Sequence, residues 1–444
     1  MKRLCVVWAM LLLLTALPGC GASIPVTVYD AQGSVLGTLD RLDFGTDSLT
    51  DAAYGDYVQL ALTEAVTALA QAKDCSESRA ERLLFSGGYA IHTALDPAIF
   101  SAVRSAYETA PEGLPFGCAI TDLNGALCAV YSGGETSYAL QPQSPHSSFK
   151  PLSVYAPALD AGTIHWGSLW RDEPYKQIKG ENGLPTNWPA NATGQYSYEE
   201  ESLRDSIRHS LNTVAVHCLH KYGVSRSLDF LEQNFDINLT AERQRMKDAD
   251  EDEIIGNIAL GSLLAGVSPV DMAGYYQIFA NYGMYTRPYA VTTIQDAAGT
   301  VVYTCAATAR QVIDPTTGCI MNRLLQSVVQ RGSTGEEAAC EDIQVAGKTG
   351  TDDLGMGNWF VGVTPQYSCA VWHGSNRDGN MASALFASIV EGLPAHTQTD
   401  FADCAGVHKG MFCKETGLLF TRRCSKIETG YYATGQAPDV CDGH

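Results

Sequence analysis

The chain has 444 residues, of which 45% are hydrophobic and 18% are charged. This composition is typical of a globular protein with a large core and excludes a disordered chain. The net charge is −20, and such an acidic chain repels phosphate backbones. We therefore expect no nucleic-acid partner.

Residues 1–23 are predicted to be a signal peptide with a lipobox. Lys2 and Arg3 precede an apolar run of about 14 residues, shorter than the roughly 20 residues that span a bilayer. The run ends in Leu17-Pro18-Gly19-Cys20, which is similar to a bacterial lipobox and predicts lipid on Cys20. Ordinary signal cleavage and a short uncleaved anchor are the alternatives. We expect export to the outer face of the bacterial cytoplasmic membrane, with a lipid or a short N-terminal anchor.

Residues 24–86 are predicted to form a hairpin and a helical linker. Two β-prone runs, 26–33 and 35–39, flank a glycine-containing turn. Residues 52–72 have helical spacing, and their apolar face holds Val58, Leu62, Val66 and Leu69. The polar segment 75–82 is expected to be a loop.

Residues 87–402 are predicted to be the main domain. Apolar runs within 118–130 flank an Asp-Leu-Asn-Gly turn and indicate a hairpin, whereas 146–282 is rich in helical patterns. Two more strands are expected at 358–363 and 367–372. Early strands, central helices and late strands predict an α+β fold, whose sheet must pair both ends of the domain.

Residues 403–444 are predicted to be a cysteine-rich tail. It contains four cysteines and ends in Cys441-Asp442-Gly443-His444. The whole chain has 14 cysteines, and setting Cys5 and Cys20 aside leaves an even number, which is compatible with disulfides in an exported protein. A zinc site is the alternative, but the wide spacing without a CxxC pair favours disulfides or free thiols. We therefore expect no metal and no cofactor.

Ser147-Ser148-Phe149-Lys150 has the spacing of a nucleophile and its base. A serine three residues before a lysine on a helical turn shares one face with it. Serine attacks only when a base removes its proton, and Lys150 can serve if burial and a second cation keep it neutral. Alone, the string also fits a helix-capping serine followed by a solvated lysine.

Ser210-Leu211-Asn212 and Lys348-Thr349-Gly350-Thr351 complete the candidate site. In a turn between helices, Ser210 can relay protons and Asn212 can hold a substrate carbonyl, although a capping pair explains them equally. Gly350 lets an extended substrate lie along a strand edge, with Lys348, Thr349 and Thr351 facing its terminal carboxylate. The N–H groups of Ser147 and Thr351 are candidates for an oxyanion hole.

The three strings in this order resemble the signature set of serine enzymes that attack D-Ala-D-Ala peptides or β-lactams. From about residue 87 to 400 the chain is similar to the transpeptidase half of class A penicillin-binding proteins. Further similar stretches include Gly256-Asn257-Ile258-Ala259-Leu260-Gly261 and Trp359-Phe360-Val361-Gly362. The resemblance implies a β-lactamase/transpeptidase-like fold, in which helices flank an antiparallel five-stranded sheet.

The resemblance also implies a function. Ser147, Lys150 and Ser210 would be catalytic, and Asn212, Lys348, Thr349, Gly350 and Thr351 would bind substrate. The enzyme would cross-link peptidoglycan stem peptides, and β-lactams would inhibit it covalently. The stretch before residue 87 is too short for the family's glycosyltransferase domain, so glycan polymerisation is not expected, and a separate glycosyltransferase is a further expected partner.

Three other functions stay open at this point. Water as the acyl acceptor would make the protein a DD-carboxypeptidase. Slow turnover would make it a penicillin-binding sensor or scaffold. A β-lactamase is disfavoured, because the Glu-x-x-Leu-Asn string of class A β-lactamases is absent.

Overall fold

The structure is a computed structural model that describes residues 24–134, 136–180, 183–248, 251–352, 354–375, 380–394 and 397–443. The predicted leader, with Cys20, lies outside these ranges. No helix within them combines the length and the apolar character that crossing a membrane requires.

The strands form two five-stranded sheets and four two-stranded ribbons among the described residues. Their bounds are β1 Val26–Tyr29, β2 Val35–Leu39, β3 Ala90–Thr93, β4 Phe116–Asp122, β5 Leu127–Gly133, β6 Leu169–Arg171, β7 Lys176–Lys179, β8 Pro185–Trp188, β9 Glu200–Ser202, β10 Met284–Tyr285, β11 Val291–Gln295, β12 Val301–Thr304, β13 Arg310–Gln311, β14 Ala346–Thr351, β15 Asn358–Val363, β16 Tyr367–His373, β17 Val407–Cys413 and β18 Ile427–Ala433.

The helices lie mainly in the middle of the chain, as the sequence predicts. Their bounds are α1 Gly55–Ala72, α2 Glu77–Leu84, α3 Pro97–Glu108, α4 Ala156–Asp160, α5 Leu203–Arg208, α6 Asn212–Tyr222, α7 Val224–Phe235, α8 Thr240–Asp248, α9 Glu251–Leu260, α10 Pro269–Tyr276, α11 Pro315–Gln326 and α12 Met381–Gly392.

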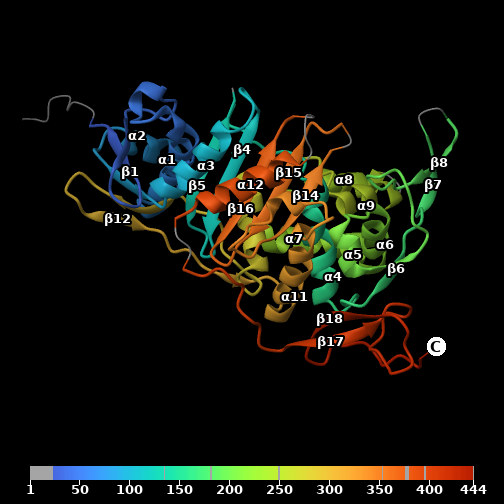
Figure 1. Cartoon of the computed structure of the whole chain (residues 1–444). Coiled ribbons are helices and arrows are strands. Elements are labelled where there is room, and N and C mark those ends of the chain that lie inside the picture. The colour runs from blue at the N-terminus through green and yellow to red at the C-terminus, as the bar shows by residue number, and fades with distance from the viewer. Residues whose placement is uncertain are drawn as a thin grey trace, which may run out of the picture.

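The central sheet has the strand order β14-β15-β16-β4-β5 and is antiparallel throughout, which confirms the predicted fold class (Figure 1). Both predicted hairpins, β4–β5 and β15–β16, are present. The pairing of β16 with β4 joins the two ends of the domain. Helix α12 covers one face, where Phe386 packs on Phe360, and α10 covers the other. The strand that carries Lys348, β14, lies at the edge of this sheet.

The N-terminal hairpin is present, but it belongs to a second five-stranded sheet. Strands β1 and β2 pair antiparallel, and β1 also pairs with β3, so the strand order is β12-β11-β3-β1-β2. This sheet takes strands from both sides of residue 87 and from residues 291–304. The predicted helix is α1, preceded by a short 3-10 turn, and its predicted apolar face is buried.

The prediction of a loop at residues 75–82 is wrong. Helix α2 spans Glu77–Leu84, and Ala80 and Leu84, four residues apart, are buried where α2 packs against α1. A one-turn apolar pair inside a polar segment gives too weak a periodicity to indicate a helix, so tertiary contact decides the conformation here.

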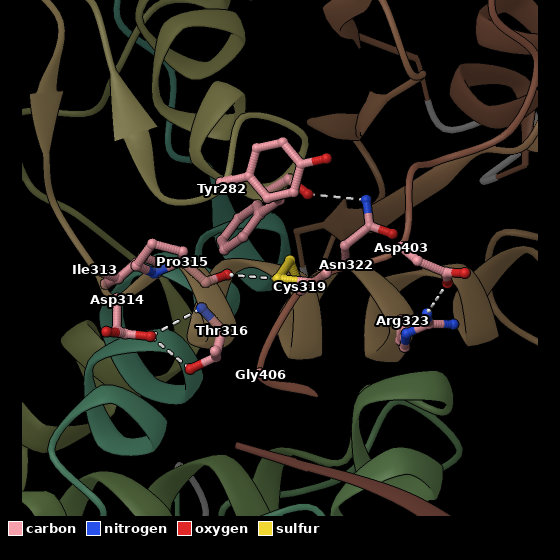
Figure 2. The surroundings of a disulfide bond; sticks show 12 residues. Tyr282, Ile313, Asp314, Pro315, Thr316, Cys319, Asn322, Arg323, Asp403 and Gly406 are labelled. Atoms are coloured by element: carbon pink, nitrogen blue, oxygen red, sulfur yellow. Dashed lines mark hydrogen bonds and ion pairs between the residues drawn. A yellow bond between two sulfur atoms is a disulfide. The ribbon is translucent and has the colours of Figure 1, made fainter. Parts of the chain in front are cut away.

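The tail forms the β17–β18 ribbon, which lies below α11 and the helical region (Figure 1). Where the tail begins, Cys404 forms a disulfide with Cys319 of α11, and Arg323 of the same helix forms an ion pair with Asp403 (Figure 2). The tail is therefore tied covalently to the main domain.

Candidate active site

The S-x-x-K segment, residues 147–150, lies between the C-terminal end of α9 and the edge strand β14. It begins as a 3-10 turn, His146–Phe149, in which the His146 N–H donates to the Gly261 carbonyl at 2.9 Å. A Cβ on Gly261 would lie 2.0 Å from the His146 oxygen, and a Cβ on Gly350 would lie 2.5 Å from the Pro145 oxygen. Glycine is therefore required on both sides, because any side chain would push the segment away.

The two adjacent serines have different environments. Ser148 is fully buried, its hydroxyl donates to the Pro145 carbonyl at 2.6 Å, and its own carbonyl accepts a hydrogen bond from the Tyr276 hydroxyl. Ser147 is partly exposed. Of the two hydroxyls, the one on Ser147 is accessible to a substrate.

Lys150 joins the first two motifs. Its Nζ donates to the Ser210 carbonyl at 2.9 Å, to Ser210 Oγ at 3.4 Å and to Asn212 Oδ1 at 2.6 Å. Ser210 lies between α5 and α6, as predicted, and its φ of 57° turns the chain so that both oxygens face the lysine. Ser147 Oγ takes part in no hydrogen bond among the described residues, so its contact with Lys150 stays a prediction.

The electrostatics of Lys150 favour a base. Burial lowers the pKa of Lys150 well below its usual value, and the charge of the nearby Lys348 lowers it further. All three oxygens within hydrogen-bond distance of its Nζ are uncharged, and the neutral amine, which has two N–H groups, donates to two of them at a time. A neutral lysine amine can accept a proton from a serine hydroxyl at neutral pH.

Lys348 lies beside this cluster on the edge strand. Its side chain is fully buried, and its Nζ donates to the carbonyl and hydroxyl oxygens of Thr349 at 3.2 and 3.4 Å. Burial lowers the pKa of Lys348 to about 7. Gly350 faces the S-x-x-K segment and Thr351 is exposed at the end of the strand. The three motifs thus meet where the edge strand contacts the S-x-x-K turn.

A buried polar network behind Asn212 is a feature that sequence reasoning missed. Asn191 Oδ1 accepts from the backbone N–H of Asn212 at 2.9 Å, and Asn191 Nδ2 donates to Asp172 Oδ1 at 2.8 Å. Thr213, next to Asn212, donates to the same carboxylate oxygen at 2.6 Å. Asn212 Nδ2 donates to the Ala190 carbonyl at 2.7 Å, which turns Oδ1 toward Lys150.

Asp172 is the centre of this network. It is 2% exposed. Burial raises its pKa, but the hydrogen bonds from Thr213, Ser197 and Asn191 outweigh burial and lower it. The carboxylate is therefore charged, and its hydrogen bonds hold the start of α6. Asp172 lies 41 residues before Thr213, so no local spacing could have indicated it.

We expect Asn191→Ala to slow acylation of Ser147 by up to about 10²-fold, because misplacing a positioned group by about 1 Å costs that much. The substitution removes the acceptor of the Asn212 N–H and frees Asn212 to shift from Lys150. Stopped-flow measurement of β-lactam acylation checks this. Asn187→Ala, an exposed asparagine on β8, is the control. Equal rates in both variants would show that the network does not position Asn212.

Comparison with known proteins gives the family. A model described as "Penicillin binding protein transpeptidase domain" matches residues 131–391. Penicillin-binding protein 1A of Clostridium acetobutylicum is 30% identical over 323 residues, which are 70% of this chain and 36% of that protein. Penicillin-binding protein 1F of Bacillus subtilis is 30% identical over 394 residues, 83% of this chain and 48% of that protein. The chain spans less than half the length of these two relatives.

Solved structures share the fold. Penicillin-binding protein 1A of Haemophilus influenzae superposes with a TM-score of 0.69 at 14% identity and covers 95% of this chain and 99% of that chain. PonA1 of Mycobacterium tuberculosis, solved in complex with penicillin V, gives a TM-score of 0.63 at 20% identity, with 77% and 93% covered. The family model matches more than half of this sequence and spans all three motifs, and the chain therefore belongs to the penicillin-binding protein transpeptidase family.

Proposed function

We propose that the chain is a serine DD-transpeptidase that cross-links peptidoglycan stem peptides. Ser147 Oγ attacks the carbonyl carbon of the penultimate D-Ala, and its proton passes to Lys150. The C–N bond to the terminal D-Ala breaks, and this leaving amine takes a proton through Ser210. An amine of a second stem then attacks the ester and gives a proton to Lys150; the C–O bond to Ser147 breaks, Ser147 Oγ takes that proton back, and the new amide is the cross-link. A β-lactam acylates the same serine by ring opening.

The observation that carries this proposal is the cluster around Lys150. A buried lysine with a lowered pKa is held by the Ser210 and Asn212 oxygens, one turn after an accessible serine and beside a second buried lysine. Desolvation combined with a specific charge partner is a mark of a catalytic group. An N-cap serine followed by a solvated lysine does not fit, because Lys150 is fully buried.

Incubation of the purified chain with a stem pentapeptide ending in D-Ala-D-Ala tests the function. With an acceptor amine present, we expect release of D-Ala and a cross-linked product, both seen by mass spectrometry. Release of D-Ala with hydrolysed donor alone would identify a carboxypeptidase. Stable β-lactam labelling without any D-Ala release would identify a sensor and contradict the proposal.

We expect the rate constant kcat/KM for a donor with a free terminal carboxylate to fall as the pH rises through about 7. The pKa of Lys348 is lowered to about 7, so its ammonium loses its proton over that range. The neutral amine then attracts the carboxylate less. Burial and the charge of Lys348 lower the pKa of Lys150 as well, which favours its neutral, basic form.

The matched control for this pH profile is the same donor esterified at its terminal carboxylate. The ester has no charge for Lys348 to bind, so its profile should lack the decline, and Lys348→Ala should harm the ester less than the acid. Identical profiles for the two donors would contradict the role of Lys348 as a carboxylate anchor.

We further propose that the protein acts outside the cytoplasm, on the outer face of the cytoplasmic membrane, held by lipid on Cys20 and acting beside a separate glycosyltransferase. The basic residues, short apolar run and Leu17-Pro18-Gly19-Cys20 support the anchor. Two acyl chains hold a protein stably, whereas one is marginal.

We expect Cys20→Ser to move the protein from the membrane fraction into the medium, provided that the signal is still cleaved. Fractionation and intact-mass measurement check this. An unmodified, uncleaved N-terminus in the membrane fraction of the parent protein would show that the apolar run is the anchor and that Cys20 carries no lipid.

A further inference from the structure

Three cysteines of the tail converge on one point. The Sγ atoms of Cys413, Cys424 and Cys441 all lie within 4.8 Å of one another. Cys413 ends β17, Cys424 lies in the loop before β18, and Cys441 lies close to the C-terminus. The fourth tail cysteine, Cys404, is bonded instead to Cys319 of α11.

The backbone of the tail builds this convergence. The Cys413 N–H donates to the Leu418 carbonyl and the Cys441 N–H donates to the Leu419 carbonyl, each at 2.8 Å. Leu419 also forms isolated β-bridges with Phe412 and Val440. The segment around Leu419 therefore lies between β17, which carries Cys413, and the segment that carries Cys441, and it fixes the separation of these two residues.

Backbone N–H groups point at two of the three sulfurs. The Thr421 N–H donates to Cys424 Sγ at 3.3 Å, and the Gly443 N–H donates to Cys441 Sγ at 3.4 Å. These contacts hold the two sulfur atoms in place and orient them toward the point at which the three cysteines converge.

The separations of the three sulfurs are compatible with a metal site. Zinc bound to sulfur at about 2.3 Å in a tetrahedral site places its ligand sulfurs roughly 3.8 Å apart, which the 4.8 Å limit accommodates. A disulfide joins only two sulfurs and would leave the third beside the bond. A cluster of three close sulfurs is the arrangement expected around a single cation.

The tail has little apolar core of its own, because Phe412, Tyr432 and Ala433 are buried as part of the core of the main domain. Its described residues after Cys404 bury few side chains: Phe412, Cys413, Tyr432, Ala433 and Cys441. Units of fewer than about 40 residues usually need disulfides, metals or association to stay folded. The disulfide ties the start of the tail to α11, but it does not cross-link the ribbon itself.

We propose that Cys413, Cys424 and Cys441 bind one thiophilic divalent cation of the zinc type. Three S–H bonds break and three metal–sulfur bonds form, with release of three protons. A water or a further ligand completes the four positions that zinc prefers. His444, which ends the same stretch of sequence, lies outside the described residues.

The sequence favoured disulfides or free thiols, because the cysteines are widely spaced and form no CxxC pair. In the structure the sulfurs are brought together by the β-bridges at Leu419, which join residues distant in sequence.

The metal would stabilise a unit that contacts the helix leading to Ser210. Glu428 of β18 forms ion pairs with Arg204 of α5 at 2.7 Å and with Lys414 at 3.3 Å. Helix α5 ends at Arg208, two residues before Ser210. The site is thus structural in kind, and its existence does not depend on the chemistry at Ser147.

The test is a measurement of bound metal on the full chain, purified with Zn²⁺ supplied and without chelator. We expect about one zinc per chain by elemental analysis, protection of the three thiols from alkylation, and a sulfur-to-metal charge-transfer band after replacement with Co²⁺. Removing the metal with a chelator should lower Tm, and adding Zn²⁺ should restore it, because a ligand that binds only the folded state stabilises it.

Cys424→Ser is the first variant, because Cys424 is the least buried of the three. We expect it to weaken Zn²⁺ binding by at least about tenfold, whereas Cys305→Ser, another partly exposed cysteine, should leave binding unchanged. A disulfide between any two of the three cysteines in the zinc-supplied protein would overturn the proposal. So would zinc that binds equally well to Cys424→Ser, or a wild-type chain that takes up no Zn²⁺ and no Co²⁺.

Discussion

Ser147→Ala is expected to reduce covalent labelling by a fluorescent penicillin to background while the protein stays folded. The hydroxyl that would form the acyl ester is removed, and no other group can replace its oxygen. Ser147 is partly exposed, and its Oγ takes part in no hydrogen bond among the described residues. Removing the hydroxyl therefore leaves no buried polar group without a partner. Gel fluorescence measures the labelling, and circular dichroism and Tm report the fold.

Ser148→Ala is the matched control. Ser148 is adjacent and fully buried, and its hydroxyl is bonded to the Pro145 carbonyl. This variant should lose roughly 1 kcal/mol of stability, because one intramolecular hydrogen bond is removed, and it should still be labelled. The reverse pattern, with labelling lost in Ser148→Ala and kept in Ser147→Ala, would show that Ser148 is the nucleophile and contradict the assignment of Ser147.

Lys150→Ala is expected to slow acylation by roughly 10²–10⁴-fold, the contribution of one positioned base. The buried amine has a pKa lowered first by desolvation and then by Lys348, so it can take the Ser147 proton. Stopped-flow acylation by a β-lactam gives the rate. The loss should appear in the acylation step rather than in deacylation alone.

Two variants make the effect of Lys150 interpretable. Lys150→Met keeps the volume of the buried side chain but has no amine, so it should be as slow as Lys150→Ala and should fill the cavity better. Lys179→Ala removes an exposed lysine of β7 and should acylate at the parent rate. A fast Lys150→Met variant with an intact fold would remove Lys150 from the mechanism.

The central sheet and the three motifs could be predicted from sequence because their signals are local. A string of three or four residues has a defined local geometry once its element is known: Ser210 in a turn, Lys348 on a strand, Lys150 one turn after Ser147. Apolar runs on both sides of a short turn also predict the β4–β5 and β15–β16 hairpins. Their mutual pairing follows from the α+β order of the elements.

What could not be predicted depends on contacts between distant residues. The parallel pairing of β1 with β3 and the antiparallel pairing of β11 with β3 set the second sheet, and neither leaves a pattern in its own strand. Helix α2 forms because Ala80 and Leu84 meet α1, although the segment around them is polar. The Asp172–Asn191–Asn212 chain of hydrogen bonds and the three converging tail cysteines likewise unite residues whose separation in sequence hides their contact.

The most direct test of the active site is the position of the acyl group after reaction with penicillin. Proteolysis of the acylated chain followed by tandem mass spectrometry should locate the adduct on Ser147, with Ser148 and Ser210 unmodified. The hydrogen bonds of Lys150 to Ser210 and Asn212, one turn after Ser147, predict this single site. An adduct on Ser148 or Ser210, or no adduct on a folded chain, would contradict the account.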